Sequence, residues 1–214
     1  MPLDFLISAI VTLFVVVDPV GLVPTFVAVT AGLPAAARRQ VAVRACVIAA
    51  AILAGSALIG SWLLTYLGIG LPAFRIAGGL LLFSIASEMV FGLRIDRQAR
   101  TAEQAIEEHV RNIAAFPLSI PLMAGPGAIT ATILLATRAD GNLRLLALLL
   151  AVIALVCALT LVIFLAANRI EKLLGITGNI VLSRLLGVLL AALAVQFVLD
   201  GLRGAGLVAS ATAL

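Results

Sequence analysis

Residues 14–26 read FVVVDPVGLVPTF and place an aspartate, a glycine and two prolines inside an otherwise apolar stretch that begins near residue 4. Asp18 and Pro19 fall about 14 residues into this stretch, some 20 Å from its start at about 1.5 Å per residue, and therefore near the centre of a bilayer. Asp accepts hydrogen bonds from free N–H groups at a helix start, and Pro is favoured at the first helical position. The stretch predicts a membrane-spanning segment that breaks in mid-membrane and restarts at Pro19.

A second interrupted stretch follows in the other half of the chain. Residues 116–132 read FPLSIPLMAGPGAITAT, with Gly125 and Pro126 at the matching place. A half-helix that starts inside the membrane directs free N–H groups and a partial positive charge towards the centre, and such backbone must line protein or a watery cavity. We expect the two starts to form a site for a small anionic group, such as the carboxylate of an amino acid.

Asp18 would lie beside that site, where it would bind an ammonium group, carry a coupling proton or coordinate a cation. The alternative is that the prolines only kink the helices and Asp18 only caps one. A carboxylate inside a membrane is costly, and this favours the functional interpretation.

Composition sets the class of protein. The chain of 214 residues is 64% hydrophobic and 11% charged, with a mean hydropathy of +1.26. Too few charges are present to cover a soluble globule, and six stretches are long enough to span a bilayer. These stretches are 4–31, 45–66, 72–93, 113–137, 144–167 and 178–202. We therefore expect an all-α polytopic membrane protein with six spans, the first and fourth of them broken, and no large extra-membrane domain.

The two halves of the chain resemble each other. Arg75 aligns with Arg184, and the triplet Gly92-Leu93-Arg94 aligns with Gly201-Leu202-Arg203. Three spans in each half force the second copy to enter the membrane from the opposite side, which predicts an inverted repeat of the kind found in secondary transporters. The expected units are 1–93, a cytoplasmic linker over 94–112, and 113–214.

Loop charges predict the orientation. Most Lys and Arg residues fall on one side of the six spans, which by the positive-inside rule faces the cytoplasm and puts both termini on the other side of a bacterial inner membrane. The charges are spread over several loops, so a nucleic-acid-binding face is not expected. His109 has no second ligand at metal-binding spacing, so no metal site is expected either.

DPVGLVP at 18–24 and PLSIPLMAGPGAIT at 117–130 resemble the two signature segments of the MarC family of integral membrane proteins, and the resemblance covers the whole chain. The family is grouped with LysE-type amino-acid exporters, and some members are described as ion-coupled transporters of small neutral amino acids. Leu22 stands where the family pattern usually has Asn. Ile129 also falls on the second motif. The candidate site comprises Asp18, Pro19, Gly21, Pro24, Thr25, Gly125, Pro126, Gly127, Ala128 and Thr130.

These observations predict a secondary transporter that moves a small zwitterion such as glycine, alanine or serine, driven by a proton or sodium gradient and without a cofactor. A homo-oligomer is compatible with the sequence. One alternative is a membrane enzyme acting on a lipid phosphate, which needs acid, base and basic groups in one cleft. Against it, the two breaks contain one carboxylate, no His and no Arg. The other alternative is a non-transporting scaffold, which predicts breaks sealed by side chains with no ligand-sized cavity.

Overall fold

The computed structural model describes residues 2–94, 97, 100, 114–139 and 141–207, and over these residues every regular element is helical. The elements are α1 (Pro2–Val17), α2 (Val23–Val29), α3 (Ala35–Tyr66), α4 (Leu71–Phe91), the π-helix η1 (Ala114–Met123), α6 (Pro126–Arg138), α7 (Leu143–Leu165) and α8 (Ala167–Gly204). α8 bends at Gly175, whose positive φ of 59° is a conformation that favours glycine.

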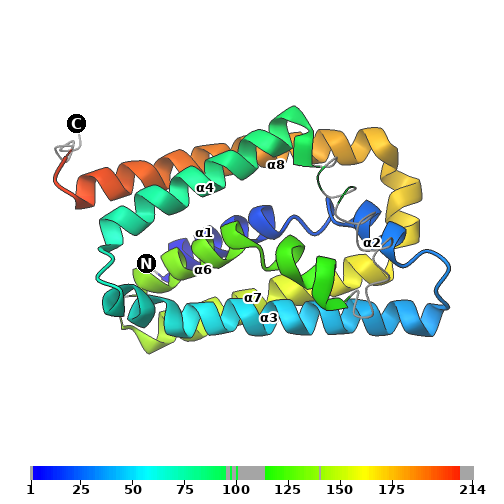
Figure 1. The fold of residues 1–214 in the computed structure, drawn as a ribbon, viewed down its shortest axis with the longest axis horizontal. Helices are drawn as coiled ribbons and strands as arrows, with labels where there is room; N and C mark the ends of the chain where they lie inside the picture. Colours follow the sequence, from blue (N-terminus) through cyan, green and yellow to red (C-terminus); the bar gives the residue numbers. More distant parts are fainter. Residues whose placement is uncertain (1, 95–96, 98–99, 101–113, 140, 208–214) are drawn as a thin grey trace.

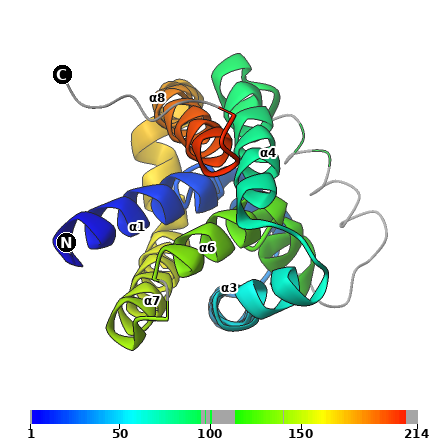
Figure 2. The ribbon, with the colours of Figure 1, turned by 90° about the vertical axis from the view of Figure 1, so that its left-hand side faces the viewer.

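The helices form a bundle with two outer pairs and a central layer (Figure 1). α3 packs against α7 and α4 packs against α8, and within each pair the two helices run in opposite directions. Seen from one end, α1 and α6 lie between these pairs (Figure 2). The end of α1 and the start of α6 thus meet in the middle of the bundle.

The structure confirms an all-helical membrane protein with several apolar spans. Four helical segments are long and apolar enough to cross a membrane: Ala35–Tyr66, Leu71–Phe91, Leu143–Leu165 and Thr177–Gly204. A fifth span results if Pro117–Met123 and Pro126–Arg138, which meet at 56°, are counted together. The first expected span is represented by the shorter α1, a break and α2, so the count of six and the inverted repeat stay predictions.

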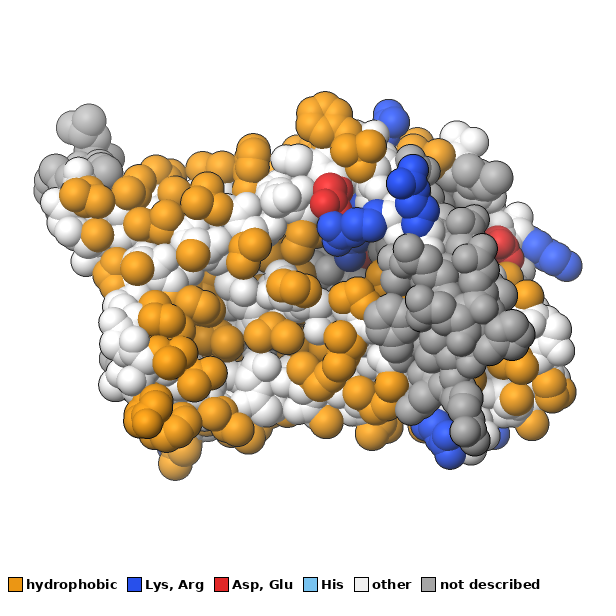
Figure 3. All heavy atoms as spheres, viewed as in Figure 1, with side chains coloured by type: hydrophobic (Ala, Val, Ile, Leu, Met, Phe, Trp, Pro, Cys, Tyr) orange, Lys and Arg blue, Asp and Glu red, His pale blue; other side chains and the backbone are white. Residues whose placement is uncertain are grey.

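Apolar and charged side chains are distributed unequally along the long axis of the molecule. Apolar side chains cover most of the face seen in Figure 3, and the charged side chains on that face gather towards one end. The start of α1 and the end of α8 lie together at the opposite end (Figure 1). This distribution is what a bilayer around the apolar part requires. Most of the expected linker, including His109, lies outside the described residues.

An ionic network lies at the end of the bundle where α1 starts and α8 ends. Arg138, the last residue of α6, pairs with Asp200 of α8 at 3.3 Å and lies 5.0 Å from the centre of the Phe197 ring. Gln196 donates to the other carboxylate oxygen of Asp200 at 2.8 Å. These contacts tie α6 to α8 at that end of the bundle.

Glycines set the close approach of α4 and α8. A Cβ on Gly79 would lie 2.7 Å from the carbonyl oxygen of Ala194, and a Cβ on Gly187 would lie 3.1 Å from the amide nitrogen of Val90. Backbone atoms cannot move aside as a flexible side chain can. Small residues at such positions allow helices to pack tightly in membranes, where the hydrophobic effect does not drive their association.

We expect Gly79→Ala to destabilise the protein by about 1–3 kcal/mol, the usual cost of overpacking a tight interface. The matched control is Gly55→Ala in α3, where a Cβ would meet nothing within 4 Å. There the higher helix propensity of Ala predicts an unchanged or raised stability. Melting temperatures of the two variants in detergent test this, and equal shifts would contradict the assigned α4–α8 packing.

Candidate functional site

The first break is closed by Asp18, which is buried with 2% exposure and has a positive φ of 53°. Asp and Asn adopt this left-handed conformation more readily than other non-glycine residues, and it ends α1. The Asp18 carboxylate accepts a hydrogen bond of 3.1 Å from the Gly21 N–H. A Cβ on Gly21 would collide with that carboxylate. Asp18 therefore terminates one helix and stabilises the turn that follows it.

The prediction that the helix restarts at Pro19 is wrong. The turn occupies residues 18–22, closed by the bond from the Leu22 N–H to the Asp18 carbonyl at 3.2 Å, and α2 begins only at Val23. α2 has seven residues, and its N-cap, Leu22, has no side chain that can accept a hydrogen bond. The first break thus provides no helix start for an anion.

The second break has the expected form. Pro117 and Pro121 lie within η1, and Pro has no N–H to donate to the helix. Gly125 is extended, with φ −77° and ψ 173°, and a Cβ there would collide with the Pro121 carbonyl oxygen. Pro126 then begins α6, where its fixed φ suits the first turn.

η1 is anchored to the bundle by Ser119. Its hydroxyl, which is fully buried, lies 2.9 Å from the carbonyl oxygen of Ala45 in α3 and 2.5 Å from that of Ala114. The Ala124 N–H donates back to the Ser119 carbonyl at 2.8 Å. These contacts hold η1 against α3 and close the last turn of backbone before the break.

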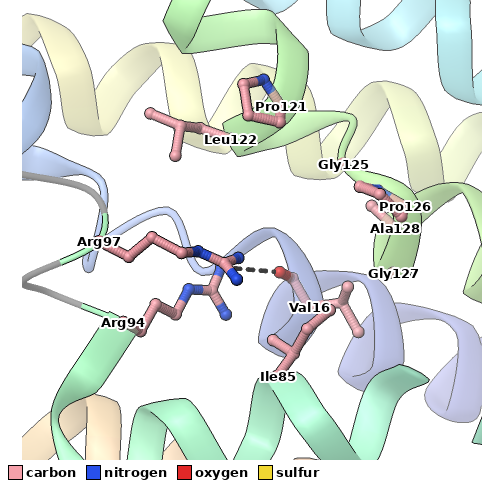
Figure 4. Close-up of a pocket in the computed structure, with 10 residues that line it drawn as sticks. All are labelled: Val16, Ile85, Arg94, Arg97, Pro121, Leu122, Gly125, Pro126, Gly127 and Ala128. Atoms are coloured by element: carbon pink, nitrogen blue, oxygen red, sulfur yellow. Dashed lines mark hydrogen bonds between the residues drawn. The ribbon is translucent and has the colours of Figure 1, made fainter. Parts of the chain in front are cut away.

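A cavity of about 70 Å³ lies at the start of α6. It is lined by residues from α1, α4, η1 and α6 and by two arginines that follow α4. Figure 4 shows the guanidinium groups of Arg94 and Arg97 side by side, pointing into the space that faces Gly125 and the first residues of α6. The full set is Val16, Ile85, Arg94, Arg97, Pro121, Leu122, Gly125, Pro126, Gly127 and Ala128.

Arg94 connects the end of α4 to the end of α1. It is only 7% exposed and donates to the Val16 carbonyl at 3.2 Å and to the Met89 sulfur at 3.1 Å. Val16 belongs to the last turn of α1, where carbonyls lack partners within the helix. Arg94 also interacts with the charge of Asp18 across the break.

Arg97 forms an ion pair beside the cavity. Its guanidinium lies 2.7 Å from Glu88 Oε1, and its side chain is 63% exposed, so the cavity reaches the surface here. The second oxygen of Glu88 is buried and has no hydrogen-bond partner among the described residues. Two carboxylates therefore interact with the two arginines of the cavity: Asp18 and Glu88 act on the charge of Arg94, and Glu88 also pairs with Arg97.

The structure brings together only part of the predicted site. Gly125, Pro126, Gly127 and Ala128 line the cavity. The candidates from the first break lie outside the lining: Asp18, Pro19, Gly21, Pro24 and Thr25. Thr130 is also outside it and packs near Gly78, where an added Cβ would lie 2.5 Å from the Thr130 methyl group.

Sequence reasoning missed the two arginines, because it assigned them to the linker. The signal was Gly92, which ends α4 in a left-handed conformation with φ 82° and so turns the following residues back towards the bundle. The break segments themselves contain no Arg, but Arg94 and Arg97 from the segment after α4 line the cavity at the second break.

Apolar spans, an interrupted helix and a small cationic cavity define a helical integral membrane protein. The model of the MarC family of integral membrane proteins matches residues 3–206, and the chain belongs to that family. It is 39% identical to a UPF0056 membrane protein of Archaeoglobus fulgidus, over 94% of this chain and 93% of the relative. It is 37% identical to the UPF0056 membrane protein YhcE of Escherichia coli, over 90% and 89%. No solved structure matches.

The turn at Asp18 predicts different effects for two substitutions. Asn adopts the left-handed conformation and retains an acceptor for the Gly21 N–H, so Asp18→Asn should keep the turn and lose only the interaction of the carboxylate with Arg94. Asp18→Ala loses both properties and should cost about 1–2 kcal/mol. Melting curves in detergent measure this, and an Ala variant as stable as the Asn variant would show that the turn does not depend on the side chain.

Proposed function

We propose that the protein is a secondary transporter of a small neutral amino acid such as glycine, alanine or serine, coupled to a proton or sodium gradient. The cavity at the start of α6 is the binding site. The observation that carries this proposal is that an interrupted helix directs its N-terminus into a cavity that also contains a buried arginine. Secondary transporters bind the anionic groups of their substrates at such half-helix starts.

The arrangement of the bundle supports this proposal. α3 runs opposite to α7, and α4 runs opposite to α8 (Figure 1). Corresponding helices of an inverted repeat would have these opposite directions. Two near-equivalent halves of opposite orientation make inward-open and outward-open states similar in energy, which alternating access requires.

The two ends of the central layer differ in a way that also supports transport. The cavity reaches the surface beside the exposed Arg97, whereas Arg138 and Asp200 hold α6 to α8 at the other end. We infer that this conformation is open towards the charged end, which faces the cytoplasm in the predicted orientation. Transport then needs a second conformation in which the Arg138–Asp200 contact separates.

The arginines also suit the alternative enzyme, since lipid phosphates are bound by basic groups. Among the described residues, however, the cavity lining has no side chain that could act as a nucleophile or general acid, such as Ser, Cys or His. We therefore favour a non-enzymatic function. A scaffold with sealed breaks is disfavoured because the second break contains a cavity.

The test is uptake of labelled glycine, alanine and serine by proteoliposomes, with and without imposed proton or sodium gradients. Leu122 lines the cavity, so Leu122→Trp should fill it and lower the initial rate by roughly tenfold or more. The matched control is Ile120→Trp, at an exposed position of the same π-helix, and its rate should equal that of the wild type.

Absence of gradient-driven uptake of all three amino acids, from protein with wild-type melting behaviour, would contradict the proposed substrate class. Equal inhibition by both Trp substitutions would contradict the location of the site.

A further inference from the structure

Arg94 is a buried cation that no carboxylate of a described residue contacts directly. It is 7% exposed, and no carboxylate oxygen of a described residue lies within ion-pair distance of it. Its hydrogen bonds go to a neutral carbonyl and to a thioether sulfur, which is a weak acceptor. Burying a charge is expensive unless it is paired. Asp18 and Glu88 act on the charge of Arg94 without an ion-pair contact, so the guanidinium can still gain from a carboxylate that contacts it directly.

The second positive element at the cavity is the start of α6. Pro126 has no N–H, and the Ile129 N–H donates to the Gly125 carbonyl at 3.0 Å. Gly127 and Ala128 lie in the first turn, where a helix offers its own N–H groups no acceptor. The N-cap, Gly125, has no side chain to accept from them. The guanidinium of Arg94 therefore faces the positive end of a 13-residue helix across an open cavity (Figure 4).

We propose that Arg94 binds the carboxylate of the transported solute, which lies between its guanidinium and the N–H groups of Gly127 and Ala128. The proposal rests on the proposed function and assigns its specificity-determining residue. A planar guanidinium pairs with a carboxylate through two parallel hydrogen bonds, which a thioether and a single carbonyl cannot offer.

The charge around the cavity selects a monoanion. Asp18 and Glu88 already offset the two arginines, since both act on the charge of Arg94 and Glu88 pairs with Arg97. Asp18 and Glu88 would repel a ligand with two negative charges more strongly than one with a single charge. Size points the same way: a cavity of about 70 Å³ holds only about five waters at roughly 10–15 Å³ each. A small carboxylate fits these limits better than a phosphate ester.

Binding would also change the contacts of α1. In the structure Arg94 holds the Val16 carbonyl at the end of that helix. When the guanidinium turns to the solute, this bond is replaced, and the end of α1 loses its link to the segment after α4. Occupancy of the site is thereby communicated to a helix of the central layer.

The test measures melting temperatures of the purified protein in detergent at constant ionic strength with five probes. Glycine and acetate carry the carboxylate, glycinamide and acetamide lack it, and inorganic phosphate carries more charge. A ligand that binds only the folded protein raises its melting temperature. We expect glycine and acetate to raise it, and the amides and phosphate to leave it unchanged.

Three variants locate the effect. Arg94→Gln should abolish the carboxylate-dependent shift. Arg94→Lys keeps the charge without the planar fork and should weaken binding roughly 10- to 100-fold. Arg44→Gln removes an exposed arginine of α3, outside the cavity, and should behave as the wild type.

Shifts of equal size in Arg94→Gln and the wild type would overturn the proposal, as would a response to phosphate or to the amides alone. If Arg94→Gln does not fold, Arg94→Lys decides, because unchanged carboxylate affinity would also overturn it. Carboxylate binding that needs Arg94, without any uptake in proteoliposomes, would contradict transport but retain the carboxylate site. Uptake that persists in Arg94→Gln would retain transport and refute the role of Arg94.

Discussion

The hydrogen bond from Arg94 to the Val16 carbonyl joins the end of α4 to the end of α1, and it shows the constraint that shapes this bundle. A chain that breaks a helix inside a membrane must provide partners for every backbone group it frees. At the first break Asp18 accepts from the Gly21 N–H, and Arg94 donates to the Val16 carbonyl. At the second break the Ser119 carbonyl accepts from the Ala124 N–H, while the start of α6 opens onto a cavity. The candidate site lies at the second break because a helix start faces a cavity there.

The two ends of α6 differ in their surroundings. The α6 segment begins at a cavity that reaches the charged end of the molecule, and it ends at Arg138, which is tied to Asp200. One short helix therefore connects the proposed binding site to the closed end of the bundle. If Arg94 binds the solute as proposed, it would link the cavity to α1 as well as to α6, the two helices of the central layer. Movement of this layer against the outer pairs is the physical form that alternating access would take here.

Features set by local chemistry could be predicted from the sequence. The breaks at Asp18 and at Gly125-Pro126 follow from residues that disrupt helices wherever they stand. The position at which the first helix restarts could not be predicted. The Asp18 carboxylate accepts from the Gly21 N–H within a turn, and the helix begins only after that turn, at Val23. The two arginines were hidden for another reason. Gly92 reverses the chain, and only the packed bundle shows that Arg94 then reaches α1 from 78 residues away.

The most direct test of the central claim is a crystal structure of the protein in lipid with saturating glycine. The account predicts a glycine carboxylate between the Arg94 guanidinium and the N–H groups of Gly127 and Ala128, with the bond from Arg94 to the Val16 carbonyl broken. Arg94 still bonded to Val16, with glycine bound elsewhere or the cavity holding water alone, would contradict it.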